Sequence, residues 1–222
     1  SGIDQVKWGW ACAPVCADID GDGDDDLYVS QIGRNVLLLN NKGIFTDVSS
    51  GSGIDDTGWG TSATFADFDG DGDLDLYQCN YLTFDFANPP VDGVNNFSCR
   101  WKGNKVMCGP KGLEPQADVV YRNDGNGKFK NVTAEWGIEA LPPSYGLGVL
   151  AGDFDRDGTA NLYVANDGMA NFCLRWDKTT ESFVDEAKDN GLALSEDGAP
   201  QAGMGVDAAD LNGDGFDDFI CT

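Results

Sequence analysis

Short apolar runs separated by acidic, glycine-rich stretches recur along the whole chain. Four of these runs are rich in branched and aromatic side chains and occupy positions 27–29, 76–78, 162–164 and 219–221. They have the length and composition of strands. In the first three copies two more runs follow, starting at Val36, Val119 and Phe172 and then at Phe45, Phe129 and Phe183. Glycines between these two runs, such as Gly43 and Gly125, are typical of hairpin turns. The pattern predicts repeated units of four short strands.

A nine-residue acidic loop precedes each of the four first-mentioned runs. In the second copy, DFDGDGDLD at residues 67–75, a carboxylate stands at every second position. A turn brings the first, third and fifth side chains together, Gly72 allows the bend, and Asp75 returns to the same point. Such a cage of oxygens suits Ca²⁺ better than Mg²⁺, which demands a stricter geometry. An EF-hand would have Glu at the twelfth position, where this chain has Gln78, so we expect a strand–loop–strand calcium site.

Four copies of the loop in register define the candidate metal ligands. An ordinary solvated turn explains one acidic run but not four with glycine at the same position. The predicted ligands stand at odd-numbered loop positions: Asp18, Asp20, Asp22, Asp24 and Asp26; Asp67, Asp69, Asp71, Asp73 and Asp75; Asp153, Asp155, Asp157, Thr159 and Asn161; and Asp210, Asn212, Asp214, Phe216 and Asp218. At the seventh position the ligand would be the backbone carbonyl oxygen.

Repeating units of about 50 residues with four strands each are typical of β-propeller blades. An aromatic or small residue followed by glycine, or by alanine in the first copy, stands before each loop, and together with the loop and the strand after it this pattern resembles FG-GAP repeats, also called VCBS repeats. These repeats form the propellers of integrin α subunits and of many secreted proteins. Residues 59–67, 99–113 and 201–207 resemble most closely the cartilage acidic protein family and its bacterial relatives. The resemblance implies an all-β propeller that has about seven blades when complete.

The repeats predict where each blade begins and ends. We expect one blade at 8–58, a second at 59–144 with an insertion at 84–117, a third at 145–200, and a partial blade at 201–222. A partial blade leaves strand edges unpaired, which is an aggregation hazard. We therefore expect a longer chain, or another segment, to complete the propeller.

The charge of the chain limits its partners and its chemistry. Fourteen Lys and Arg against 38 Asp and Glu give a formal charge of −24, which repels phosphate and disfavours nucleic acid or an anionic membrane as partner. The chain has no histidine, so it lacks the commonest general base and the Ser-His-Asp triad. No apolar run is long enough to predict a membrane span.

Cysteines and sequons favour an oxidising compartment. We expect Cys99 and Cys108, both in the insertion, to form a disulfide. Cys12 and Cys16 would lie about 13 Å apart on one strand, too far to bridge each other, so we expect core positions or partners in other blades. The pairing of Cys79, Cys173 and Cys221 stays open.

Two N-glycosylation sequons start at Asn96 and Asn131. Together with weak calcium loops, which fill at extracellular calcium levels, they favour an extracellular, secretory-route or periplasmic location.

The insertion is slightly basic in an acidic chain, with Arg100, Lys102, Lys105 and Lys111. Its aromatic residues, Phe97 and Trp101, fit either of two roles. The insertion is a recognition loop on a rigid scaffold, or it is a flap that covers a blade edge.

The function favoured by these features is non-catalytic: a calcium-stabilised propeller that binds a protein or glycan ligand in recognition or adhesion. One alternative is a structural subunit of a larger assembly. The other is a propeller enzyme, a lyase or hydrolase acting on carbohydrate, which the fold alone does not exclude.

The number of carboxylates per loop predicts an order of calcium affinity. The first and second loops supply four carboxylates each at positions one, three, five and nine, whereas Asn161 and Asn212 leave the third and fourth with three. Less negative charge attracts the cation less, so the first two loops should bind calcium more tightly. Calcium titration with single-loop variants measures this order. Four equal sites, or tighter binding by the last two, would contradict it.

Overall fold

Four antiparallel sheets, one for each blade, follow one another in sequence order, and two small two-stranded sheets lie in the insertion. The computed structural model describes residues 2–89, 99–106 and 108–222, and every structural statement below concerns these residues. The first sheet contains β1 (Trp10–Ala17), β2 (Asp26–Ile32), β3 (Val36–Asn41) and β4 (Ile44–Asp47). The second contains β5 (Gly60–Ala66), β6 (Asp75–Asn80), β11 (Val119–Asn123) and β12 (Phe129–Asn131).

The third and fourth sheets continue the same plan. The third contains β13 (Gly146–Gly152), β14 (Asn161–Met169), β15 (Phe172–Asp177) and β16 (Ser182–Asp185), and β17 (Gln201–Ala202) pairs with β14. The fourth contains β18 (Val206–Ala209) and β19 (Asp218–Cys221). The short 3₁₀ turns are η1 (Ile3–Gln5) and η2 (Ile138–Ala140).

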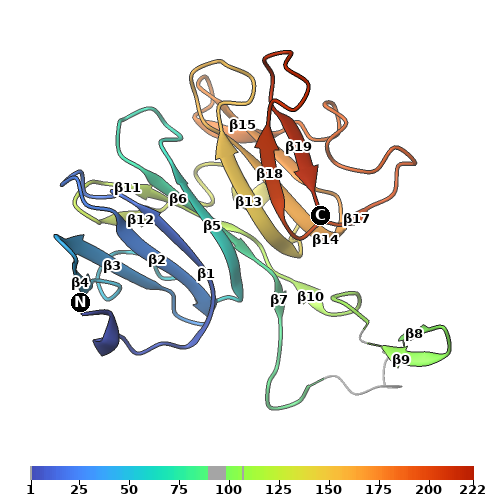
Figure 1. Ribbon diagram of the computed structural model, residues 1–222, viewed down its shortest axis with the longest axis horizontal. Coiled ribbons are helices and arrows are strands. Elements are labelled where there is room, and N and C mark those ends of the chain that lie inside the picture. Colours follow the sequence, from blue (N-terminus) through green and yellow to red (C-terminus); the bar gives the residue numbers. More distant parts are fainter. Residues whose placement is uncertain (1, 90–98, 107) are drawn as a thin grey trace.

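The sheets stand face to face in an arc, with their first strands β1, β5, β13 and β18 side by side (Figure 1). The acidic loops that join the first and second strands of each sheet all lie along one edge of this arc. The insertion extends from the opposite edge (Figure 1). It contains the pair β7 (Leu82–Thr83) and β10 (Glu114–Pro115) and the hairpin β8 (Cys99–Trp101) and β9 (Asn104–Val106). The predicted all-β fold of four-stranded propeller blades is confirmed.

The hydrophobic cores lie between neighbouring blades. One core joins residues such as Tyr77 and Trp136 of the second blade to Leu162 and Trp176 of the third. The second strand of each complete blade is therefore mostly buried, and residues 75–79 of β6 are all completely buried. This explains why these strands read as continuous apolar runs rather than as an alternation. Burial of each large apolar side chain stabilises a seam between blades by about 1.5–3 kcal/mol.

The first strand of each of the three complete blades carries a bulge that the sequence did not reveal. The pairing register shifts at Cys12, Thr61 and Leu147, the second or third residue of the strand. At the second of these bulges the Thr61 hydroxyl donates a hydrogen bond of 2.7 Å to the carbonyl oxygen of Gly146 in the next blade. The bulge thereby links neighbouring blades as well as bending its own strand.

Cys12 and Cys16 are both exposed on β1 and unpaired, so the expectation of core positions for them is wrong. β1 is the first strand of the arc in sequence order, and its residues are exposed or only partly buried along the whole strand. Cys79 and Cys173 are instead buried between blades.

A repeated side-chain clamp holds the second strand of each complete blade. Asn35, Asp118 and Asn171 each accept a hydrogen bond of 2.8–2.9 Å from a backbone N–H of that strand. Asp118 is buried and also accepts the hydroxyl hydrogen of Tyr77, at 2.8 Å. In the third blade the direction of this hydrogen bond is reversed, since the side-chain amide of Asn171 donates to the hydroxyl oxygen of Tyr163 at 2.8 Å. An amide can therefore replace the carboxyl at this position.

Burial raises the pKa of Asp118 to about 7, against its usual value near 4. The folded chain thus holds this proton more tightly than the unfolded chain, and stability falls as pH rises from about 4 to about 7.

We predict that Asp118→Asn removes this loss of stability at higher pH. In urea unfolding the variant should gain up to about 4 kcal/mol over the parent chain at pH 8 and less at pH 5. A difference in unfolding free energy that does not change with pH would contradict the prediction.

Candidate metal centre

Backbone hydrogen bonds to the first aspartate shape each acidic loop. In the second loop the Asp67 carboxylate accepts hydrogen bonds from the backbone N–H groups of Gly70 at 2.8 Å and Gly72 at 3.0 Å. Asp18, Asp153 and Asp210 accept the equivalent bond from the sixth-position glycine at 2.9–3.0 Å. Gly72 has φ +98°, in a region that side chains disfavour, which explains the glycine at this position.

Three loops bring carboxylates together as predicted. In each, one oxygen from the first, third and fifth positions lies within 4.8 Å of the other two: Asp18, Asp20 and Asp22; Asp67, Asp69 and Asp71; Asp153, Asp155 and Asp157. Unit like charges at about 4 Å repel by about 1–4 kcal/mol per pair at the effective dielectric constants of a protein surface and water. Partial burial and the neighbouring Asp71 charge raise the pKa of Asp69, and burial and Asp22 do the same for Asp20. These loops are strained electrostatically and could hold a metal ion.

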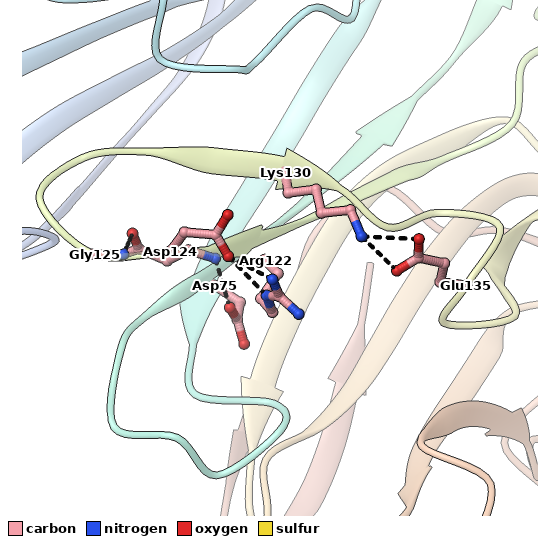
Figure 2. Close-up of polar contacts among 7 residues, drawn as sticks. Asp75, Arg122, Asp124, Gly125, Lys130 and Glu135 are labelled. Atoms are coloured by element: carbon pink, nitrogen blue, oxygen red, sulfur yellow. Dashed lines mark hydrogen bonds and ion pairs between the residues drawn. The ribbon is translucent and has the colours of Figure 1, made fainter.

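The ninth-position aspartate ties the loop to the third strand of its blade. Both oxygens of Asp75 accept backbone N–H groups, from Phe68 at 3.0 Å and from Asn123 at 2.9 Å, the latter drawn in Figure 2. Asp26 makes the same two bonds in the first blade, with Ile19 and Asn40. Burial raises the pKa of Asp75 to about 7. This latch role was not foreseen, and metal ligation by Asp26 and Asp75 remains a prediction.

Side chains at the seventh position make different contacts in the four loops, and within the described chain only that of Thr159 bonds to a member of a carboxylate triad. The Asp24 carboxylate accepts the backbone N–H of Lys42 at 2.8 Å, and Asp73 lies against the turn at Gly125. The hydroxyl of Thr159 donates to Asp157, and the ring of Phe216 stacks under the guanidinium of Arg156 at 4.6 Å. Ligation by the backbone carbonyl at this position stays a prediction. The contact from Arg156 to the fourth loop was not predicted, because it joins two blades.

The two loops with amide substitutions keep the loop shape. Asn212 accepts the backbone N–H of Asp214 at 2.8 Å, as the third-position aspartates do elsewhere, and Asp218 accepts that of Leu211 at 3.0 Å. In the third loop Asn161 is only 4 % exposed, and its amide oxygen has no hydrogen-bond partner in the described chain. A buried oxygen that accepts no hydrogen bond fits the role of a metal ligand. A site whose ligand atoms are all oxygens suits Ca²⁺.

The insertion combines a packed base with an exposed tip. Phe84 and Phe86 lie 6.0 and 6.3 Å from the Trp59 ring, so the base covers the end of the second blade. Trp101 at the tip is 63 % exposed, with the Lys102 ammonium 4.3 Å from its ring centre. The predicted disulfide between Cys99 and Cys108 is confirmed, with the Cα atoms 5.1 Å apart. Asn131 is exposed on β12, whereas Asn96 and Phe97 lie outside the described residues.

We predict that Asp69→Asn lowers calcium affinity at the second loop by about tenfold, because it removes one carboxylate from the triad. The loop should keep its shape, since Asn212 makes the same turn bond in the fourth loop. Asp25→Asn is the control, because it removes the same charge from an exposed position of the first loop outside the triad. Titration calorimetry measures both variants. Equal losses in the two would show that net charge alone sets the affinity.

Comparison with known proteins agrees with this geometry. The model of the FG-GAP-like repeat matches residues 10–77 and 112–164, more than half of the chain. No curated protein matches the chain. Among the described residues, no helix has the length and apolar character needed to cross a membrane. With repeats that match the family model and the acidic loops in equivalent places of successive blades, the chain belongs to the family of FG-GAP-like repeat proteins.

Proposed function

We propose that this protein is a calcium-stabilised propeller module that binds a protein or glycan ligand without catalysing a reaction. The observation that carries the proposal is the set of three carboxylate triads in successive blades along one edge of the arc (Figure 1). A regular series of costly charge clusters makes physical sense when each cluster receives a cation.

Calcium would act on the whole blade because the loops of the three complete blades are anchored in the core through Ile19, Phe68 and Phe154. In the second loop Phe68 is completely buried, and its ring centre lies 5.3 Å from that of Phe183 in the third blade. The next anchor is Asp75, which holds β11 through Asn123. An ion that neutralises Asp67, Asp69 and Asp71 would fix the loop between these anchors and stiffen the seam between blades. A rigid scaffold of this kind presents recognition surfaces at a low entropic cost.

The exposed tip of the insertion supports a role in recognition. Trp101 and Lys102 form a cation–aromatic pair in a chain whose charge is otherwise strongly negative. Exposed aromatic and cationic side chains are common at binding hot spots. We further propose a relationship to the cartilage acidic protein family and an extracellular, secretory-route or periplasmic location, which the Cys99–Cys108 disulfide favours.

The proposal is tested by screening the full chain against glycans and extracellular matrix proteins, in 2 mM Ca²⁺ and in EDTA. We expect at least one ligand to bind in calcium, with binding weakened about tenfold or more by Trp101→Ala. Val106→Ala, another exposed residue of the insertion, is the control and should have little effect.

Two outcomes would overturn this proposal in favour of its alternatives. Turnover of a carbohydrate that depends on one carboxylate would identify an enzyme. Isolation of the chain only in a stoichiometric complex, with no ligand bound by the free chain, would identify a structural subunit.

A further inference from the structure

A polar cavity of about 280 Å³ lies at the seam between the second and third blades, beside the second acidic loop. The loop contributes Asp69 and Asp71, and β11 contributes Arg122. The turn between β15 and β16 contributes Lys178 and Glu181. The cavity therefore brings together two cationic side chains and the wall of a candidate calcium site. Residues from two blades form it, so it exists only in the folded arc.

Both cations have donors to spare. Arg122 donates from Nε and Nη2 to one oxygen of Asp124, at 2.9 and 2.6 Å (Figure 2). Its Nη1 group makes no hydrogen bond within the described chain, and the side chain is 35 % exposed. Lys178 is exposed and has no ion pair with any residue that the structure describes. An anion entering the cavity could accept hydrogen bonds from both groups.

Calcium in the second loop would cancel the negative charge balance at this cavity. Without metal, its three carboxylates outnumber its two cations and repel an anion. Asp67 is the third ligand of the loop, so four carboxylates face two cations, and one Ca²⁺ held by Asp67, Asp69 and Asp71 brings this balance to neutral and removes the net repulsion. Anion binding here is therefore conditional on the metal.

The remaining lining favours a sugar ring over a simple inorganic anion. The edges of Trp136 and Trp176, which are otherwise buried at 6 % and 3 % exposure, form the apolar wall, with ring centres 4.8 Å apart. Glu181 and Asp69 are acceptors for hydroxyl donors, and Lys178 is a donor to hydroxyl oxygens. A few polar groups around an aromatic wall are typical of sites for small polar ligands. A sulfate or phosphate ion would leave the aromatic wall and Glu181 unused.

The equivalent seam between the first and second blades lacks these features. In the repeat register, Leu39 stands in place of Arg122, Ser52 in place of Trp136, and Asn123 in place of Trp176. Leu39 fills that seam, since its Cδ2 lies 3.2 Å from where a Cβ on Gly127 would stand. The cavity is thus a property of one seam and not of the repeat.

We propose that this cavity binds the carboxylate of an acidic monosaccharide unit, a hexuronate, when the second loop holds Ca²⁺. The carboxylate faces Arg122 and Lys178, and the ring lies against the tryptophan edges. This proposal rests on the proposed function, because it takes the loop as a calcium site and the protein as a binding module. By linkage, hexuronate should also raise the calcium affinity of the second loop.

The test measures binding of D-glucuronate to the full chain by ligand-observed NMR, with D-glucose as the neutral analogue and a short acidic peptide as the alternative ligand. In 5 mM Ca²⁺ we expect glucuronate to bind with a Kd of about 1 mM, and glucose and the peptide at least tenfold more weakly. EDTA should abolish binding. Lys178→Gln should weaken it about tenfold, whereas Lys42→Gln should leave it unchanged. Lys42 occupies the matching turn position in the first blade, so both variants lose the same charge.

The negative outcomes separate the two proposals. The hexuronate proposal fails if glucose binds as well as glucuronate, if the peptide binds better, or if Lys178→Gln and Lys42→Gln behave alike. In each of these cases the binding-module proposal stands if another ligand still binds in calcium. If calcium itself does not bind to the chain, the proposed function fails, and the hexuronate proposal fails with it.

Discussion

The mutual repulsion of aspartates held in short loops is the constraint on which the rest of the structure depends. Three oxygens of Asp67, Asp69 and Asp71 lie within 4.8 Å of one another, and the Asp67 bonds to Gly70 and Gly72 keep them there. The backbone therefore prepares the cluster before any ion arrives. Preorganisation of this kind lowers the entropic cost of binding. Relief of the repulsion between the carboxylates adds to the free energy of cation binding.

The loops matter to the fold because they are continuous with the seams between blades. Phe68 follows the first ligand of its loop and packs between the second and third blades, while Asp75 ends the loop and holds β11. Metal binding, seam packing and strand pairing are consequently coupled within a few residues. The same coupling places the cavity proposed for hexuronate beside a loop, since Arg122 lies in β11, the strand that Asp75 holds, and pairs with Asp124 (Figure 2).

Local features could be predicted from the sequence, and contacts between blades could not. Strand runs, acidic loops, hairpin glycines and the Cys99–Cys108 disulfide each depend on residues close together in the chain. The exposure of Cys12 and Cys16 depends on which sheet covers β1, and the stacking of Arg156 on Phe216 depends on how two blades stand. The second use of Asp75, as a latch to Asn123, needs a strand 48 residues away. Repeat patterns predict the strands and loops of each blade, but they do not predict which side chains meet between neighbouring blades.

Thermal unfolding with and without calcium tests the central claim most directly. If each loop binds with a Kd near 0.1 mM, 2 mM Ca²⁺ stabilises the folded chain by about 1.8 kcal/mol per site relative to EDTA. Across the triads of the three complete blades this raises the melting temperature by at least about 5 °C, and Mg²⁺ at the same concentration raises it less. The same melting temperature in calcium and in EDTA would show that the carboxylate clusters do not hold the metal, and the account would be wrong.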